Sequence, residues 1–311
     1  MTIQLEIANR VANLNITHPK ITKIWSFLDS IRTQNKYKLG SSKSGKRHIS
    51  VIGPSGVGKS QMGLRYAENN PGHTELSEDG LEEVDIRPVV YLELPDPFTI
   101  KELYQNISIA LGFPEIPKRI TIGEAQRQTF TLLKKQKVEV LILDELDYIL
   151  TSNVPYKAAM NAIKKIANKA NITLVLMGTP EVESTLIKIN FQNFRRYPKY
   201  YMRRFDKCDE EWCNLLKAID EQIALPEKLG LGEVETGLPE LLFGMSKGLL
   251  GILIPVIQEF FSLLGLFEKD FRDVSKLQFN EESIDKLLEA YENINGDLTE
   301  EEMETMLQKG Y

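Results

Sequence analysis

Cysteine and histidine are scarce in this sequence of 311 residues, which holds only two cysteines and three histidines. Two cysteines cannot build a disulfide framework, and three scattered histidines give no spacing typical of a metal cluster. We therefore expect Cys208 and Cys213 to be reduced and structural, as in cytoplasmic proteins. The first six residues, MTIQLE, have neither the charged start nor the apolar run of a signal peptide. Together these absences favour a cytoplasmic location.

A long apolar run without charge is missing as well. The most apolar stretch covers residues 248–267, and it contains Pro255, Gln258 and Glu259. Polar and charged side chains in the middle of such a stretch are costly in lipid. We expect a buried helix of a lid domain here rather than a membrane span.

Basic residues are not in excess, since the net charge is -6. This charge excludes a chain coated in basic residues but is compatible with a local basic groove for DNA. The charge is unevenly spread, because the charged residues in 1–50 are mainly basic and those in 276–311 are mainly acidic. Such ends suit different partners, a tail that packs on a neighbouring subunit, or two solvated ends, and the pattern leaves these alternatives open.

Four short apolar runs alternate with segments of helical pattern. The runs are rich in Val, Ile and Leu without polar alternation, which is typical of strands buried on both faces. They cover residues 48–53, 88–94, 138–144 and 172–178, and the helical patterns cover residues 60–69, 100–111, 123–135 and 156–170. After Pro226 only helical patterns occur. We predict an α/β fold, in which a parallel sheet with flanking helices is followed by a small all-helical C-terminal lid.

Three regions are expected from this order. A basic helical region covers residues 1–46 and ends in a polar stretch rich in serine and glycine. The core with the sheet covers residues 47–225. The helical lid and an acidic tail cover residues 226–311.

One glycine-rich segment has the pattern of a phosphate-binding loop. Residues 53–60 are GPSGVGKS and match G-x-x-x-x-G-K-[ST], between a β-like run and a helical pattern. Glycines allow a tight turn that points backbone N–H groups at an anion, and the following helix N-terminus adds to the attraction. Lys59 would reach the β- and γ-phosphates of ATP, and Ser60 would hold Mg²⁺. The predicted nucleotide-binding residues of the loop are Gly53, Pro54, Ser55, Gly56, Val57, Gly58, Lys59 and Ser60.

Two adjacent carboxylates follow another apolar run, in the sequence VLILDE at residues 140–145. We expect this strand to lie beside the strand of the phosphate loop, so that Asp144 helps to bind Mg²⁺. Glu145 would then be placed to act as the general base for the attacking water. Asp147 is interpreted as a residue that starts a helix rather than as a catalyst.

Thr179 follows the last apolar run. If its strand neighbours the strand of Asp144, the hydroxyl could sense the γ-phosphate or position the water. A threonine at the end of a strand is also a common turn former, so both interpretations remain open.

These three motifs, in this order, resemble those of AAA+ ATPases, and the segments that follow narrow the resemblance. NFRR at residues 193–196, RRF at 203–205 and DEEW at 209–212 come next. Over about residues 20–265 the order is similar to that of the TniB/TnsC family of AAA+ regulators of DNA transposition, related more distantly to MuB and IstB.

The resemblance implies a P-loop AAA+ core that binds ATP and Mg²⁺. It implies a homo-oligomer, either a ring or a helical filament, on double-stranded DNA. Such an oligomer recruits a transposase to the target, contacts a TniQ-like target-selection protein, and is disassembled by ATP hydrolysis.

The resemblance also implies residue roles. Asp144 and Glu145 match the magnesium and catalytic acids, and Thr179 matches the sensor. Arg195 or Arg196 matches an arginine finger that reaches the γ-phosphate of a neighbouring subunit, unless they form a solvated surface pair. Many AAA+ proteins have a second sensor arginine where this chain has Ile252, and its absence fits a slow, regulatory ATPase.

DNA contacts are expected in the loop before the helical pattern of residues 123–135. In the resembling family this loop faces the DNA channel. Lys118, Arg119 and Thr121, with Lys101 nearby, would suit sequence-independent contacts to phosphates, and a solvated loop is the alternative. A basic stretch at residues 188–207 is expected at the subunit interface.

The favoured function is an ATP-dependent regulator of transposition. A helicase loader or initiator-like ATPase would share the loop, the acids and DNA binding. A nucleotide-dependent signalling scaffold is the third alternative, although Glu145 argues against a switch without hydrolysis.

Overall fold

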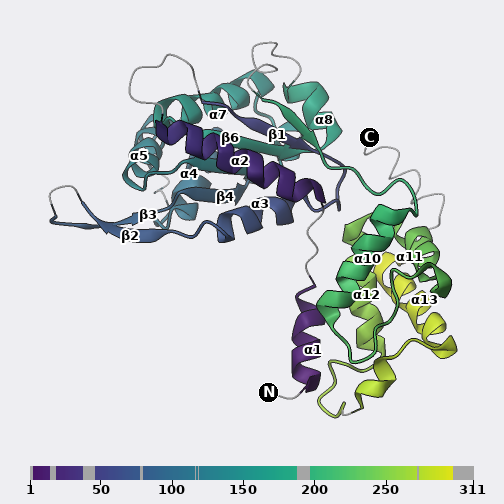
Figure 1. Ribbon diagram of the computed structural model, residues 1–311. Coiled ribbons are helices and arrows are strands. Elements are labelled where there is room, and N and C mark those ends of the chain that lie inside the picture. The colour runs from purple at the N-terminus through teal and green to yellow at the C-terminus, as the bar shows by residue number, and fades with distance from the viewer. Residues whose placement is uncertain are drawn as a thin grey trace. The chain divides into compact units, whose positions relative to one another are not determined.

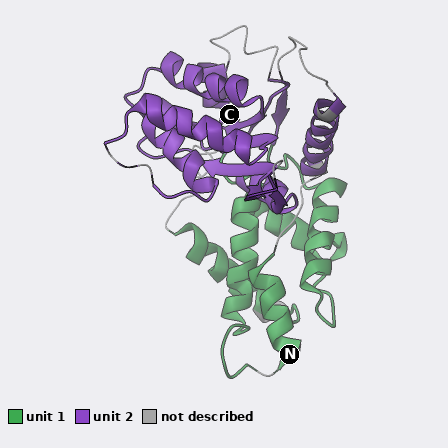
Figure 2. Cartoon of the chain, turned by 90° about the vertical axis from the view of Figure 1, so that its left-hand side faces the viewer, with its two compact units in different colours: residues 1–18, 55–58, 203–309 green, residues 19–54, 59–202, 310–311 purple. Residues whose placement is uncertain are grey.

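The computed structural model describes residues 3–14, 19–37, 46–77, 80–115, 117, 119–187, 197–271 and 273–296. The chain forms two compact units (Figure 2). The sheet unit contains residues 19–54 and 59–202, and the helical unit contains residues 1–18, 55–58 and 203–309. These boundaries differ from the three expected regions, because the first 46 residues are shared between the units.

The sheet unit is built on a parallel sheet, which confirms the predicted fold class. Within the described residues the sheet has five strands, and neighbouring strands are parallel in every pair. Their order across the sheet is β4 (Val89–Glu93), β5 (Val140–Asp144), β6 (Thr173–Gly178), β1 (Ile49–Ile52) and β7 (Lys199–Tyr201). Every residue of β1, β5 and β6 is buried, as the uninterrupted apolar runs predicted.

One expectation about this sheet is wrong. β5, which ends in Asp144, does not lie beside β1, the strand that leads into the phosphate loop. β6 lies between them and pairs with both, with Ile52 opposite Gly178 and Leu143 opposite Leu176. The single sequence could not fix this order, because the length of the connection between two parallel strands does not determine which strand lies between them.

Helices cover both faces of the sheet (Figure 1). Alternate strand residues, among them Leu92, Leu143 and Leu176, form one core cluster with α4 (Ile100–Ala110), α5 (Ile122–Lys135) and α7 (Tyr156–Ala170). The opposite face carries Tyr91 and Met177, which contact α3 (Lys59–Glu68) at Gly63.

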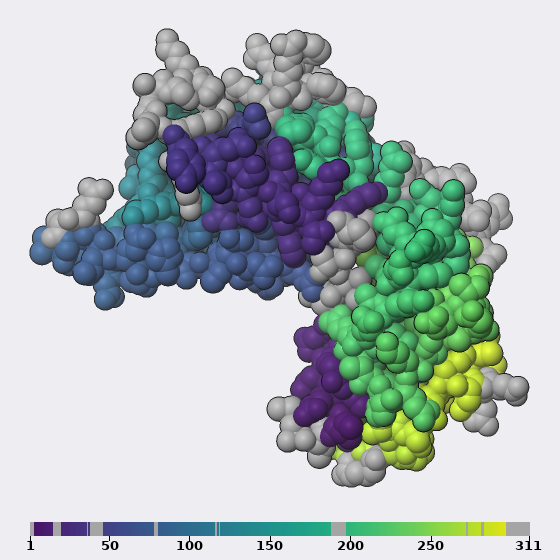
Figure 3. All heavy atoms as spheres, viewed as in Figure 1, coloured from purple at the N-terminus to yellow at the C-terminus, as the bar shows by residue number. Residues whose placement is uncertain are grey.

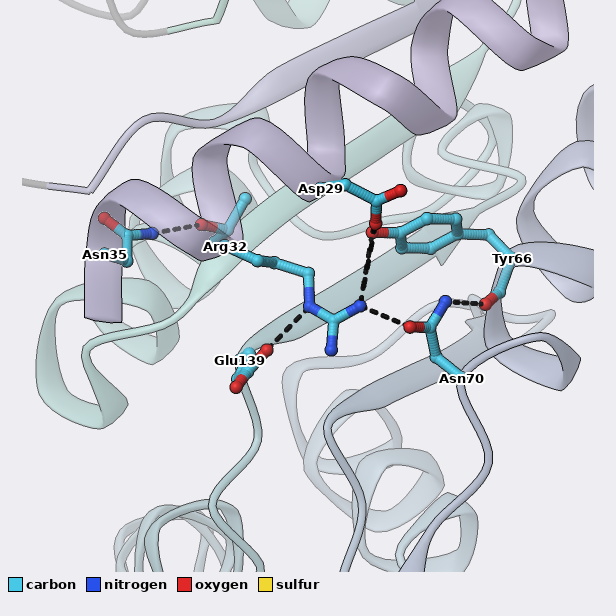
Figure 4. A network of polar contacts seen from close by, with 7 residues as sticks. Asp29, Arg32, Asn35, Tyr66, Asn70 and Glu139 are labelled. Atoms are coloured by element: carbon cyan, nitrogen blue, oxygen red, sulfur yellow. Dashed lines mark hydrogen bonds and ion pairs between the residues drawn. The ribbon is translucent and has the colours of Figure 1, made fainter. Parts of the chain in front are cut away.

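The helix α2 (Pro19–Tyr37) is fixed to the sheet unit by polar contacts (Figure 4). The guanidinium of Arg32 donates to Glu139, 2.6 Å away, and to Asn70. The hydroxyl of Tyr66 donates to Asp29 at 2.7 Å, and the indole of Trp25 donates to the carbonyl of Met62 at 3.1 Å. These contacts join α2 to α3, the helix that follows the phosphate loop.

A separate antiparallel hairpin extends from the sheet unit, in blue at the left of Figures 1 and 3. It consists of β2 (His73–Leu76) and β3 (Glu83–Ile86). This hairpin was not predicted from the sequence, because its strands are short, mostly exposed and rich in acidic residues. Lys135 and Lys137 pair with its Glu82 and Glu75.

The helical unit packs around one apolar core that includes Trp212, Phe260 and Phe261. Its α-helices are α1 (Ile3–Ala12), α10 (Glu210–Ile223), α11 (Leu238–Ser246), α12 (Leu250–Leu263) and α13 (Glu281–Asn295). Ile7 and Val11 of α1 are fully buried in this core. The apolar stretch around Pro255 forms α12, as predicted.

The helices of the described residues do not fit a membrane span taken one by one. No single helix among them is long and apolar enough to cross a bilayer. Only α11 and α12 taken together reach that length and composition, and they are bent by 119° relative to each other.

Candidate nucleotide-binding site

The phosphate loop connects β1 to α3, as predicted. Gly56 and Gly58 have φ angles of +78° and +89°, a region that favours glycine, so the motif needs glycine at these places. Lys59 is only 8% exposed, and its ammonium donates to the carbonyls of Gly53 at 2.8 Å and Pro54 at 2.9 Å. It is therefore held along the loop, where a phosphate oxygen would be a stronger acceptor than either carbonyl.

The charge of Lys59 lies within a group of carboxylates. Burial lowers the pKa of Lys59, and the negative charges of Asp144, Glu145 and Asp147 oppose this effect. A buried cation that faces three acids is a suitable place for a ligand that carries both phosphates and a divalent cation.

Backbone hydrogen bonds hold two residues of the loop, Gly53 and Gly56. The amide of Gly53 donates to the carbonyl of Gly178 at the end of β6, at 3.2 Å. Residues 55–58 group with the helical unit, where the amide of Gly251 donates to the carbonyl of Gly56 at 2.8 Å. Gly251 immediately precedes Ile252, the residue expected at the position of the second sensor arginine of many AAA+ proteins.

Asp144 is completely buried at the end of β5. The hydroxyl of Tyr91, on β4, donates to its Oδ2 at 2.9 Å, and the amide of Glu145 donates to its Oδ1 at 2.8 Å. Burial, followed by the charge of Asp144, raises the pKa of Tyr91, so this tyrosine stays a donor. Tyr91 was not predicted from the sequence, because its place beside Asp144 depends on the pairing of β4 with β5.

Glu145 has the properties of a general base. It adopts a positive φ of 52°, which is uncommon for a residue with a side chain and is often found at functional sites. Burial raises the pKa of Glu145, and the neighbouring charges of Asp144 and Asp147 raise it further, while Lys59 acts in the opposite direction. A carboxylate with a raised pKa accepts a proton more readily.

Thr179 lies next to the acidic strand, because β6 pairs with β5. Its amide donates to Oδ2 of Asp147 at 3.2 Å, and its hydroxyl donates to Oδ1 of the same carboxylate. Asp147 is the first residue of α6 (Asp147–Leu150), in agreement with its interpretation as a helix-start residue. The contact with Thr179 is a second role that the sequence did not indicate.

The residues present fit ATP with Mg²⁺. Mg²⁺ prefers hard oxygen ligands and usually takes only one or two from the protein when phosphates supply others. Asp144 and Ser60 offer a carboxylate and a hydroxyl, and the described residues contain no group of three or more His, Cys, Asp or Glu side chains that could hold a metal ion. The donor set therefore suits a metal that arrives with a nucleotide.

The residues predicted for the arginine finger and for DNA contacts are only partly described by the structure. Lys118, Arg195 and Arg196 lie outside the described residues. Lys101 is half-buried in the first turn of α4, and Arg119 is exposed.

Thr121 caps α5 together with Glu124. The amide and the hydroxyl of Thr121 both donate to the carboxylate of Glu124, at 2.8 and 2.7 Å, and its hydroxyl accepts from the amide of Glu124. These hydrogen bonds lower the pKa of Glu124. A carboxylate therefore occupies the helix end that was expected to face DNA phosphates.

The strand β7 was not predicted, and its anchor explains how it is held beside β1. The ammonium of Lys199 contacts Glu183 at 2.5 Å, with side-chain exposures of 10% and 8%. The hydroxyl of Tyr201 donates to the same carboxylate at 2.9 Å. This buried pair joins the short helical turn Glu183–Ile187 to the edge strand β7.

The strand order, the loop and the acids together define a P-loop ATPase of the AAA+ class. Residues 13–207 match the family model of the bacterial TniB protein, so the chain belongs to the TniB family. Membership in this family of AAA+ proteins makes the chain an ATPase. No curated protein matches the sequence.

Solved structures share the fold at low sequence identity. The ORC2 protein of Aeropyrum pernix, in ADPNP–ADP complexes, is 14% identical with a TM-score of 0.57, over 95% of this chain and 74% of that one. CDC6P from Pyrobaculum aerophilum is 12% identical with a TM-score of 0.57, over 97% of this chain and 88% of that one. ORC1 of Aeropyrum pernix in complex with DNA is 12% identical with a TM-score of 0.56, over 91% and 67% of the two chains.

Proposed function

We propose that this ATPase binds ATP and Mg²⁺, assembles on double-stranded DNA in the cytoplasm, and directs a transposase to its target. The observation that carries the proposal is the family match over residues 13–207, a segment that includes the phosphate loop, the acidic pair and Thr179. ATP hydrolysis would end the assembly. A transposase and a TniQ-like protein are the partners expected from the same family.

Each residue of the site has a role in this proposal. Lys59 and the loop amides would hold the phosphates, and Asp144 with Ser60 would hold Mg²⁺, which neutralises phosphate charge when bound. Glu145 would take a proton from the attacking water. Arg195 or Arg196 would stabilise transition-state charge at the site of a neighbouring subunit.

Slow turnover is part of the proposal. Many AAA+ proteins have a second sensor arginine where this chain is expected to have Ile252, which offers no charge to the nucleotide. Slow ATP hydrolysis suits a protein whose assembly on DNA must last until a partner arrives. A single-turnover hydrolysis rate typical of a processive motor would contradict this.

DNA binding is proposed to depend on phosphate contacts. Lys101, Lys118 and Arg119 are the proposed contacts. Thr121 contributes less, because its amide and hydroxyl are used in the cap with Glu124. The double change Lys118→Ala with Arg119→Ala should weaken binding to all DNA sequences about equally and reduce the dependence on salt. An unchanged affinity and salt slope would remove this loop from the proposal.

The decisive experiment is electron microscopy of the protein with duplex DNA in ATP, in ADP and without nucleotide. The parent protein should form rings or filaments on DNA with ATP only. Lys59→Ala should form none, and Glu145→Gln should form assemblies that persist. Lys169→Ala, at an exposed position of α7, is the matched control and should behave like the parent. Assemblies of equal extent with Lys59→Ala would contradict the proposal.

A helicase loader or initiator is the second candidate, favoured by the fold of the ORC and CDC6 structures. That likeness concerns the fold, whereas the family match favours transposition. A neighbouring gene for an integrase-type transposase would support the first candidate, and a replicative helicase partner the second. A signalling scaffold is set apart by the same microscopy, because it would not require DNA.

A further inference from the structure

Two strand ends meet beside the phosphate loop at Asp147 and Thr179. The amide of Leu146 donates to the carbonyl of Met177 at 3.1 Å, which joins the turn after β5 to the end of β6. Asp147 is the residue after Leu146, and its carboxylate accepts hydrogen bonds from both the amide and the hydroxyl of Thr179. The hydroxyl is therefore held by a contact that depends on the ends of two buried strands.

The direction of the hydroxyl proton decides what Thr179 can bind. A threonine hydroxyl has one proton and two acceptor lone pairs, and an ionised carboxylate can only accept. In the contact with Asp147 the proton points at the carboxylate. Thr179 Oγ1 therefore offers only lone pairs to any other group, and these repel the anionic oxygens of a phosphate but accept a proton from water.

We propose that Asp147 is a positioning residue for ATP hydrolysis, which takes the proton of the Thr179 hydroxyl so that Thr179 orients the attacking water instead of binding the γ-phosphate. The inference rests on the nucleotide site proposed above and gives its sensor a defined chemistry.

ATP hydrolysis begins with the attack of a water molecule on the γ-phosphorus. The water oxygen forms a bond to the γ-phosphorus as the bond from that phosphorus to the oxygen of ADP breaks. One water proton passes to the carboxylate of Glu145. The second proton stays on the attacking oxygen and is hydrogen-bonded to Thr179 Oγ1, so that the oxygen lone pair is free to face phosphorus.

The electrostatics of the site agree with this arrangement. Asp147 interacts with Glu145 as well as with Lys59, so its carboxylate lies among the groups that surround the reaction.

Thr179→Val separates the two possible roles, because it removes the hydroxyl and keeps the shape. We expect kcat to fall about 10-fold or more, in the range of a lost contact to the reacting water. The ratio of the affinities for AMPPNP and ADP, measured with the purified full chain, should stay within about 2-fold of the parent. Thr179→Ser should retain most of the activity. Thr131→Val is the matched control, since the exposed Thr131 hydroxyl donates to the carbonyl of Arg127 in its own helix.

Asp147→Asn tests the positioning role. An asparagine side chain can donate its amide to Thr179 Oγ1 and so turn the hydroxyl proton toward the nucleotide. We expect a lower kcat with a preference for AMPPNP over ADP that is equal to or greater than that of the parent. A structural role alone would not produce this combination.

Three results would overturn the inference. One is a Thr179→Val protein that hydrolyses ATP at the parental rate. Another is a Thr179→Val protein that loses its preference for AMPPNP by about 10-fold, as expected when a hydrogen bond to a charged group is lost. The third is an Asp147→Asn protein that is folded by circular dichroism and keeps the parental kcat. If Asp147→Asn does not fold, Thr179→Val and Thr179→Ser alone decide. A parent protein that binds no AMPPNP would instead overturn the proposed nucleotide site, and the inference with it.

Discussion

The backbone amide of Gly251 lies 2.8 Å from the carbonyl oxygen of Gly56 and donates a hydrogen bond to it. The two backbones approach so closely that a Cβ atom on Gly251 would lie 2.7 Å from the Cα of Gly56. Such a distance requires the backbone to shift. The first turn of α12 thus holds Gly56 of the phosphate loop through a main-chain hydrogen bond.

Gly251→Ala is therefore expected to displace the loop and weaken nucleotide binding about 10-fold. Alanine favours a helix over glycine by about 1 kcal/mol, so α12 itself would not be weakened. Fluorescence titration with a labelled ADP measures the affinity. Gly244→Ala is the control, because a Cβ there meets no atom within 4 Å. Equal affinities of both variants and the parent would show that the contact does not position the loop.

The raised pKa of Glu145 predicts an acid limb in the pH profile of hydrolysis. Burial raises the pKa above the usual glutamate value of 4.5, with further contributions from Asp144, Asp147 and Glu93, while Lys59 lowers it. The base must be ionised, so kcat at saturating ATP should fall as the pH decreases through this raised pKa and level off above it. Circular dichroism at each pH distinguishes this from unfolding. A rate that stays constant down to pH 4.5 would contradict the assignment of Glu145 as the base.

Tyr91→Phe removes the hydroxyl that donates to Oδ2 of Asp144 at 2.9 Å. Groups that orient a metal ligand typically affect metal affinity by 10- to 100-fold. We expect the Mg²⁺ concentration that gives half-maximal hydrolysis to increase about 10-fold. Tyr156→Phe is the matched control, since Tyr156 is exposed and donates only to the carbonyl of Leu150 in the described structure. An unchanged Mg²⁺ dependence would indicate that the hydroxyl serves packing alone.

Arg32→Met is expected to destabilise the sheet unit by about 2 kcal/mol, because it leaves Glu139 without this partner in a half-buried place. For a unit of the size of the sheet unit, that corresponds to a decrease in Tm of roughly 4–8 °C. The side chain of Arg32 is only 14% exposed. Lys135→Met is the control, because its pair with Glu82 has side-chain exposures of 50% and 66%, and such pairs contribute little. Equal Tm values for the two variants would argue against a stabilising role of Arg32.

Much of the fold could be predicted from local patterns. The four buried strands were visible as apolar runs, and the helices between them followed from periodicity. The strand order could not be predicted from local patterns, because the position of β6 between β1 and β5 is a property of the whole sheet. The strand β7 has only three residues, held by the pair of Lys199 with Glu183, and nothing local in KYY distinguishes it from a loop.

In the candidate site, too, local features could be predicted from the sequence, whereas features that depend on strand pairing could not. The phosphate loop and Asp144 with Glu145 could be identified because their chemistry lies within a few adjacent residues. Tyr91 contributes through a neighbouring strand, 53 residues before Asp144. Asp147 was visible but its link to Thr179, 32 residues later, depends on the pairing of β5 with β6.

The burial of α1 in the helical unit also has a consequence for biosynthesis. Ile7 and Val11 leave the ribosome long before α10 and α12, the helices that cover them, which begin only at Glu210 and Leu250. Until most of the chain has been translated, this apolar stripe has no native partner and stays a target for chaperones. A fragment made of residues 203–296 alone would lack these two side chains and would expose the apolar surface against which they pack.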